Sequence, residues 1–273
     1  MSDLVKAIIL GVVQGLTEFL PISSSGHLVL FEQVLNYKEG GLAFEVFVHF
    51  GTLIAVLIVF RKDILNMIRC LPAVPAFLKN GMKIQSEEDK FKALTLFIII
   101  GSIPAAFLGL LFEDTIEQLF DSHVLVLVAL MVTGIIMWSS RYTEEKLSFM
   151  NWRHSVWIGL AQAFAIIPGI SRSGSTIVGG MWLGINRELT ARFSFLLSVP
   201  VILGASILKL KDLLIAPPPA EQITNITSAT IASAIAGYLA IIWLLNIIRK
   251  QKLEWFGVYC ALVSIIGLII VFT

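Results

Sequence analysis

Charged side chains are scarce in this sequence. Only 14% of the 273 residues are Asp, Glu, Lys or Arg, whereas 57% are hydrophobic. A soluble globular domain carries about 25% charged residues, so the composition excludes that class. Together with a mean hydropathy of +0.87, it indicates a polytopic membrane protein.

Neither sign of charge dominates, and cysteine is nearly absent. The 20 Lys and Arg residues against 19 Asp and Glu leave a net charge of +1, so no nucleic-acid partner is expected. The two cysteines, Cys70 and Cys260, lie far apart without the spacing of metal ligands or of a disulfide framework. We interpret both as small apolar packing residues.

Six apolar runs are long enough to cross a bilayer, which takes about 20 residues of helix. They cover approximately residues 42–60, 93–112, 123–139, 192–210, 227–247 and 255–273. The polar stretch 61–92 holds seven Lys or Arg residues, and the positive-inside rule assigns it to the cytoplasm. Alternation then puts residues 113–122, which are acidic and lack Lys and Arg, outside.

Two further apolar segments, residues 4–35 and 155–185, are each too short for two crossings. The alternation of sides nevertheless requires each segment to begin and end on one side of the membrane. We therefore expect both to be re-entrant helical hairpins, the first entering from outside and the second from the cytoplasm. Broken helices are tolerated at membrane depth only beside protein or a water-filled cavity, which favours a polar pocket there.

The two hairpins resemble each other in sequence. Gln14 precedes a Pro-Ile-Ser-Ser-Ser-Gly run in the first, and Gln162 precedes Pro-Gly-Ile-Ser-Arg-Ser-Gly in the second. Each hairpin is followed by three spans. The sequence therefore predicts an all-α polytopic membrane protein with six transmembrane helices and two re-entrant hairpins. It forms one domain, residues 1–273, built from inverted-topology repeats at 1–140 and 150–273 whose hairpin tips meet.

The first hairpin tip contains several polar groups that are costly to bury in hydrocarbon. Glu18, which lies one helical turn after Gln14, and His27 and three serines all fall within a stretch of ten residues. Each such group costs roughly several kcal/mol to bury, so the cluster indicates a functional site. The serines are Ser23, Ser24 and Ser25.

The second tip has the composition of an anion-binding loop. Gly169 and Gly174 free the backbone to turn its N–H groups inward, and Arg172 offers a fork of donors suited to phosphate. Small residues also mediate helix packing in membranes, but an unpaired guanidinium at depth costs at least about 2.5 to 3.5 kcal/mol. Arg172 therefore indicates a carboxylate or phosphate partner. Hydroxyl donors are available from Ser171, Ser173 and Thr176.

Together the tips predict a site for a phosphate or diphosphate. A carboxylate beside a diphosphate is poorly placed unless a cation lies between them, so we expect Mg2+ or Ca2+ to bridge Glu18 and the ligand. His27 is a candidate base, acid or nucleophile, and Ser24 is a competing nucleophile that His27 could activate. Glu45 and His49, four residues apart in a predicted span, are weaker candidates for the same cavity.

On these residues the chain resembles the undecaprenyl-diphosphatase family, the bacitracin-resistance phosphatases of bacterial inner membranes. The resemblance extends over essentially the whole chain and rests on Gln14-x-x-x-Glu18 with Pro21 to His27, and on Pro168-Gly169-x-Ser171-Arg172-Ser173-x-x-Thr176. It implies hydrolysis of undecaprenyl diphosphate to the monophosphate and inorganic phosphate. This reaction recycles the lipid carrier of peptidoglycan synthesis and confers bacitracin resistance.

The resemblance also implies roles for individual residues. Glu18 would belong to the metal and acid/base group, Arg172 would hold the diphosphate, and His27 or Ser24 would attack or transfer the proton. Substrate contacts are expected from Gln14, Ser23, Ser25, Ser171, Ser173, Gly174 and Thr176. Gln14 stands where many members have Glu, although the family motif accepts either, which leaves Glu18 as the principal carboxylate.

Expected partners are the polyprenyl diphosphate, membrane lipids and a second copy of the chain in a homodimer, while bacitracin would compete by sequestering the substrate. The expected location is the bacterial inner membrane, with the site opening outward. The principal alternative is a lipid-phosphate flippase or transporter, which inverted repeats suit equally well. A structural scaffold would leave Glu18, His27 and Arg172 without a purpose.

Overall fold

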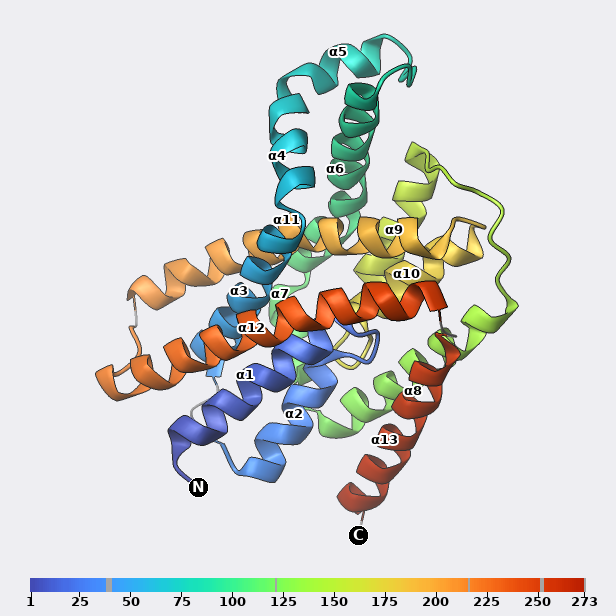
Figure 1. Cartoon of the computed structure of the whole chain (residues 1–273). Coiled ribbons are helices and arrows are strands. Elements are labelled where there is room, and N and C mark those ends of the chain that lie inside the picture. Colours follow the sequence, from blue (N-terminus) through green and yellow to red (C-terminus); the bar gives the residue numbers. More distant parts are fainter. Residues whose placement is uncertain (38–40, 121, 216, 251–252, 273) are drawn as a thin grey trace.

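The computed structural model describes residues 1–37, 41–120, 122–215, 217–250 and 253–272. These residues form helices joined by short connections, and they contain no named strand. The helices are α1 (Asp3–Phe19), α2 (Ser24–Leu35), α3 (Gly41–Val59), α4 (Arg61–Cys70), α5 (Val74–Lys79), α6 (Glu87–Leu111), α7 (Glu113–Phe120), α8 (His123–Ser139), α9 (Trp152–Phe164), α10 (Arg172–Trp182), α11 (Arg187–Ile215), α12 (Ala220–Lys250) and α13 (Glu254–Phe272). Figure 1 shows their arrangement.

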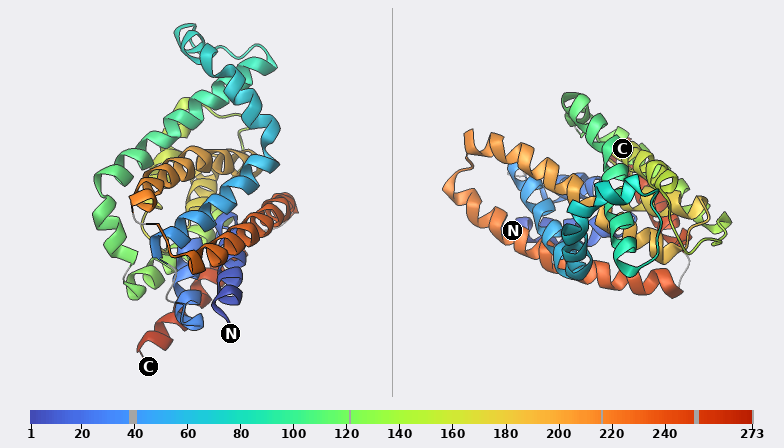
Figure 2. Two further views of the ribbon diagram at one scale, coloured as in Figure 1. Left: turned by 90° about the vertical axis from the view of Figure 1, so that its left-hand side faces the viewer. Right: turned by 90° about the horizontal axis from the view of Figure 1, so that it is seen from above.

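Five helices are long and apolar enough to cross a membrane, namely α6, α8, α11, α12 and α13. A sixth crossing is available if the pair Ala43–Val59 and Arg61–Lys79, bent by 83°, counts as one span. These helices coincide with the six predicted apolar runs, so the prediction of an all-α polytopic membrane protein is confirmed. Both termini lie at one end of the molecule and the α4–α5 segment at the other (Figures 1 and 2).

The two predicted hairpins are α1 with α2 and α9 with α10. Their helices have 17, 12, 13 and 11 residues, all shorter than the roughly 20 that a crossing needs. Pro21 and Pro168 lie in the breaks, where a missing N–H and a restricted preceding residue stop the helix. Each second helix then begins at a serine cap, Ser23 in one hairpin and Ser171 in the other.

Each hairpin packs against a helix of the opposite half of the chain. Helix α1 lies along α12 and α9 lies along α6, while α3 contacts α11 and α8 contacts α13 (Figure 1). The α1–α12 and α9–α6 contacts are counterparts of each other, and the α3–α11 and α8–α13 contacts each join equivalent helices of the two halves, as two inverted repeats would produce. The repeat relationship and its boundaries, 1–140 and 150–273, stay a prediction.

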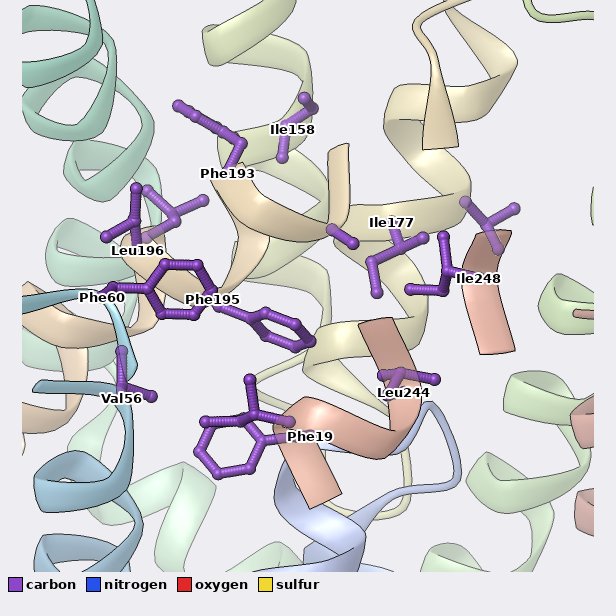
Figure 3. Packing of buried hydrophobic residues seen from close by; sticks show 14 of the residues in the cluster. Phe19, Val56, Phe60, Ile158, Ile177, Phe193, Phe195, Leu196, Leu244 and Ile248 are labelled. Atoms are coloured by element: carbon purple, nitrogen blue, oxygen red, sulfur yellow. The ribbon is translucent and has the colours of Figure 1, made fainter. Parts of the chain in front are cut away.

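A hydrophobic cluster lies beside the hairpins and anchors the end of α1 (Figure 3). Phe19 packs edge-on against Phe195 of α11, with ring centroids 5.6 Å apart and planes at 88°. Phe60 contacts the same ring with a centroid distance of 6.0 Å. Because Phe19 is fully buried and directly follows Glu18, this packing holds the helix that carries the carboxylate.

Helices α1 and α12 approach so closely that their contact requires glycine. A Cβ added to Gly11 would lie 2.2 Å from the Ala229 carbonyl oxygen, and one added to Gly15 would lie 2.5 Å from the Ser233 carbonyl oxygen. Membrane helices associate through such small-residue contacts because surrounding lipid is as apolar as the helices themselves. The position of α1 therefore depends on these two glycines.

Gly11→Ala should destabilise the protein by about 1–3 kcal/mol, because the added methyl meets backbone and forces α1 away from α12. Gly109→Ala is a matched control, since a Cβ there meets nothing within 4 Å. The measurement is the midpoint of thermal unfolding in detergent. We expect a lower midpoint for Gly11→Ala and an unchanged midpoint for Gly109→Ala. Equal midpoints in the two variants would contradict the close packing of α1 against α12.

Candidate active site

The two hairpin tips meet, as predicted, through hydrogen bonds that cross from one tip to the other. The Gly169 N–H donates to Ser25 Oγ at 3.1 Å, and Ser173 Oγ donates to the Leu20 carbonyl at 3.2 Å. Helices α2 and α10 both begin at this meeting point. Because a helix N-terminus carries partial positive charge and unpaired N–H groups, their convergence favours binding of an anion.

The central contact of the site is an ion pair between Glu18 of α1 and Arg172 of α10. Arg172 Nη2 donates to Glu18 Oε1, and Arg172 Nη1 donates to the Ser194 carbonyl at 3.4 Å. The two charged side chains are only 7% and 15% exposed. Glu18 is therefore the carboxylate partner that an arginine at this depth requires.

The other carboxylate oxygen of Glu18 is surrounded by three further side chains. Ser24 Oγ donates to Oε2 at 2.7 Å and Gln14 Nε2 donates at 3.0 Å. His49 Nε2 lies 3.7 Å from the same oxygen. The Glu18 carboxylate is thus contacted by side chains from four helices, α1, α2, α3 and α10. The predicted residues Gln14, Ser24 and Arg172 come together around it.

His27 belongs to α2, but its ring bonds to other groups. Nδ1 lies 2.8 Å from the Ser23 carbonyl, which only accepts, so Nδ1 carries the hydrogen. In the neutral ring Nε2 then accepts from the Tyr259 hydroxyl at 2.8 Å. Activation of Ser24 by His27 was one of the alternatives that the sequence left open; in this structure the Ser24 hydroxyl donates to Glu18.

Two residues of the site were not found from the sequence. Tyr259 lies 232 positions after His27 on α13. Thr133 of α8 holds the second tip, donating to the Gly169 carbonyl at 2.9 Å and accepting from the Ser171 N–H at 2.9 Å. A hydroxyl inside a predicted span is the one hint that Thr133 offers.

Most hydroxyls predicted to contact phosphate have protein partners in this structure. Ser171 Oγ accepts from the Gly174 N–H at 3.1 Å and so caps α10. Thr176 Oγ1 donates to the Arg172 carbonyl at 2.8 Å and lies 2.6 Å from Ser194 Oγ. These bonds fix the loop that presents Arg172, and direct contact of the hydroxyls with substrate stays a prediction.

Both tips bend through the left-handed region of the backbone. Ser23 has φ 70°, which costs a non-glycine residue about 1–3 kcal/mol and is typical of functional sites. Gly169 has φ 93°, and a Cβ there would lie 2.2 Å from the Val126 carbonyl oxygen. The tips are therefore held in their shape by the helices around them.

Known proteins are similar to this sequence over nearly its full length. The sequence profile described as "Bacitracin resistance protein BacA" matches residues 7–266. The chain belongs to the BacA family. Relatives named "Undecaprenyl-diphosphatase" include that of Methanobrevibacter smithii, 43% identical over 97% of this chain and 96% of its own length. Those of Halothermothrix orenii and Desulfatibacillum aliphaticivorans are each 44% identical, over 98% and 95% of both chains respectively.

The site of this BacA-family protein could hold a divalent cation, although few of its side chains could act as ligands. Mg2+ commonly uses one or two carboxylates together with phosphate oxygens and water. Glu18 supplies a carboxylate, and Gln14 Oε1 is buried without a hydrogen-bond partner among the described residues. Because Gln14 Nε2 touches Glu18, a half-turn of that amide brings an oxygen beside the carboxylate. The described residues contain no group of three or more His, Cys, Asp or Glu able to hold a metal, so a cation bound here would need substrate oxygens and water as further ligands.

Tyr259→Phe should destabilise this BacA-family protein by about 1–3 kcal/mol, because it leaves the buried Nε2 of His27 without a donor. Tyr142→Phe serves as the control, since that side chain is 74% exposed. Thermal unfolding of both variants in detergent measures the difference. An unchanged midpoint in Tyr259→Phe would show that the hydrogen bond contributes no stability.

Proposed function

We propose that this protein is an undecaprenyl-diphosphate phosphatase, which hydrolyses undecaprenyl diphosphate to undecaprenyl phosphate and inorganic phosphate. The observation that carries the proposal is the Ser24 hydroxyl donating to Glu18 at 2.7 Å, beside Arg172 and at two converging helix N-termini. Membership of the BacA family and the name shared by its curated relatives support the same activity.

The terminal phosphate binds where the tips meet. A guanidinium has five N–H donors, more than the two protein contacts of Arg172 use, so the remaining donors are available to phosphate oxygens. The N-termini of α2 and α10 add partial positive charge. Further contacts are proposed for the tip residues Ser23, Ser25, Ser171, Ser173, Gly174 and Thr176.

Ser24 is the favoured nucleophile. As its Oγ bonds to the terminal phosphorus, Glu18 is in position to take the hydroxyl proton. The bond from that phosphorus to the bridging oxygen breaks, undecaprenyl phosphate leaves, and water then releases inorganic phosphate from the serine. His27, bonded to Ser23 and Tyr259, holds α2 in place for this attack.

Glu18 and Gln14 would hold the proposed divalent cation, Mg2+ or Ca2+. Bound there, the cation neutralises charge on the diphosphate beyond what Arg172 balances. The isoprenoid tail lies among membrane lipids between the spans, because burying each CH2 is worth about 0.8 kcal/mol and the bilayer offers that environment.

We assign the protein to the bacterial inner membrane with its site opening to the outer face. The basic segment 61–92 marks the cytoplasmic end, and the termini lie at the opposite end (Figures 1 and 2). The reaction recycles the lipid carrier of peptidoglycan synthesis. It confers bacitracin resistance because it consumes the lipid that bacitracin sequesters. We also propose that two copies of the chain form a homodimer.

A lipid-phosphate carrier is the alternative function, which the pairing of hairpins with opposite halves also suits. A carrier needs Arg172 but has no use for a serine held on Glu18. Phosphate release by purified protein separates the two functions.

Arg172→Lys should lower release of inorganic phosphate from a polyprenyl diphosphate about 10- to 100-fold, because a point charge cannot replace the planar fork. Arg192→Lys is the matched control, since Arg192 pairs with Asp63 away from the tips.

Ser24→Ala should abolish release of inorganic phosphate, and EDTA should suppress this release by the wild type.

Wild-type protein that binds the lipid diphosphate tightly but releases no phosphate would establish the carrier instead. Full release by Arg172→Lys would contradict the role of the guanidinium.

A further inference from the structure

His49 of α3 touches Glu18, yet the proposed reaction gives it no role. Its Nε2 lies 3.7 Å from Glu18 Oε2, and its side chain is 33% exposed against 7% for the carboxylate. That distance is too long for a direct hydrogen bond.

The other ring nitrogen decides what His49 presents to Glu18. Nδ1 lies 2.8 Å from the Glu45 carbonyl, one turn earlier on α3. The carbonyl only accepts, so Nδ1 carries the hydrogen, and in the neutral ring Nε2 has a lone pair and lies near the carboxylate. Histidines that ligate metals are held in this way, with the second nitrogen donating to a backbone carbonyl or carboxylate.

The separation of Nε2 and Oε2 suits two ligands of one cation. A histidine nitrogen lies about 2.0–2.1 Å from Zn2+ and a carboxylate oxygen about 2.0–2.2 Å, so two ligand atoms can lie up to about 4.2 Å apart. The observed 3.7 Å falls within this limit without movement of either helix. Gln14 Oε1, buried without a hydrogen-bond partner in the described part of the chain, can become a third ligand atom once its amide makes the half-turn described above.

We propose that His49 Nε2 and Glu18 Oε2 together ligate the divalent cation of this site. This inference rests on the proposed function, in which phosphate oxygens complete the shell. Imidazole suits transition-metal ions, whereas Mg2+ and Ca2+ prefer oxygen ligands throughout. The protein therefore binds Mn2+ more tightly than Ca2+, and His49 is the cause of that preference.

Pulsed electron paramagnetic resonance of Mn2+ added to the purified full-length protein tests the ligation directly, because a bound imidazole couples its 14N nucleus to the ion. We expect 14N coupling in the wild type and its loss in His49→Gln, with Mn2+ affinity falling about 10- to 100-fold. His123→Gln is the matched control, since His123 is not among the contacts of Glu18. His49→Asn replaces His49→Gln if that variant does not fold.

Coupling that persists unchanged in His49→Gln, or that is absent from the wild type, overturns the proposal. Phosphate release measured on the same preparations separates this inference from the proposed function. Wild-type release without 14N coupling overturns His49 ligation and leaves the phosphatase standing. Coupling lost in His49→Gln, with no release by the wild type, supports the cation site and rejects the phosphatase.

Discussion

The ion pair between Glu18 and Arg172 is the interaction on which the site depends. It joins two hairpins whose residues lie 154 positions apart, in surroundings where neither charge is tolerated alone. Removing one partner of a buried pair typically costs about 3–5 kcal/mol of stability, so through this pair each hairpin holds the other in position. The same pair places a guanidinium beside a serine hydroxyl, which is the arrangement that phosphoryl transfer needs.

Several other polar contacts at the tips help to hold this pair in place. Thr133 clamps the second tip from α8, and Ser25 and Ser173 bond the tips to each other. Behind them, Phe19 anchors the end of α1 in the hydrophobic cluster (Figure 3). Since the backbone groups of a break in a membrane helix must be satisfied by protein or by water in a cavity, these contacts also stabilise the breaks in the bilayer.

Spans, breaks and charged tip residues could be predicted from the sequence because the bilayer constrains them one segment at a time. Hydropathy reveals a span, the shortness of segments 4–35 and 155–185 reveals that they are re-entrant, and the cost of burying Arg172 reveals that it needs a partner. The sharp bend after Val59 was not predicted, because the apolar run 42–60 gives no sign that the helix continues as α4.

Side-chain partners could not be predicted, since they depend on how distant helices are rotated against each other. Nothing near His27 in the sequence points to Tyr259, and nothing near Ser24 says that its hydroxyl faces Glu18 rather than His27. His49 was recognised as polar in a span, but its approach to Glu18 follows from the packing of α3 beside α1.

A double-mutant cycle on Glu18→Gln and Arg172→Met tests the central claim most directly, with the free energy of unfolding measured in detergent for both single variants and the double variant. If the pair joins the hairpins, each single variant loses about 3–5 kcal/mol and the double variant loses far less than the sum. Losses that simply add would show that the two side chains act independently, and would contradict this account.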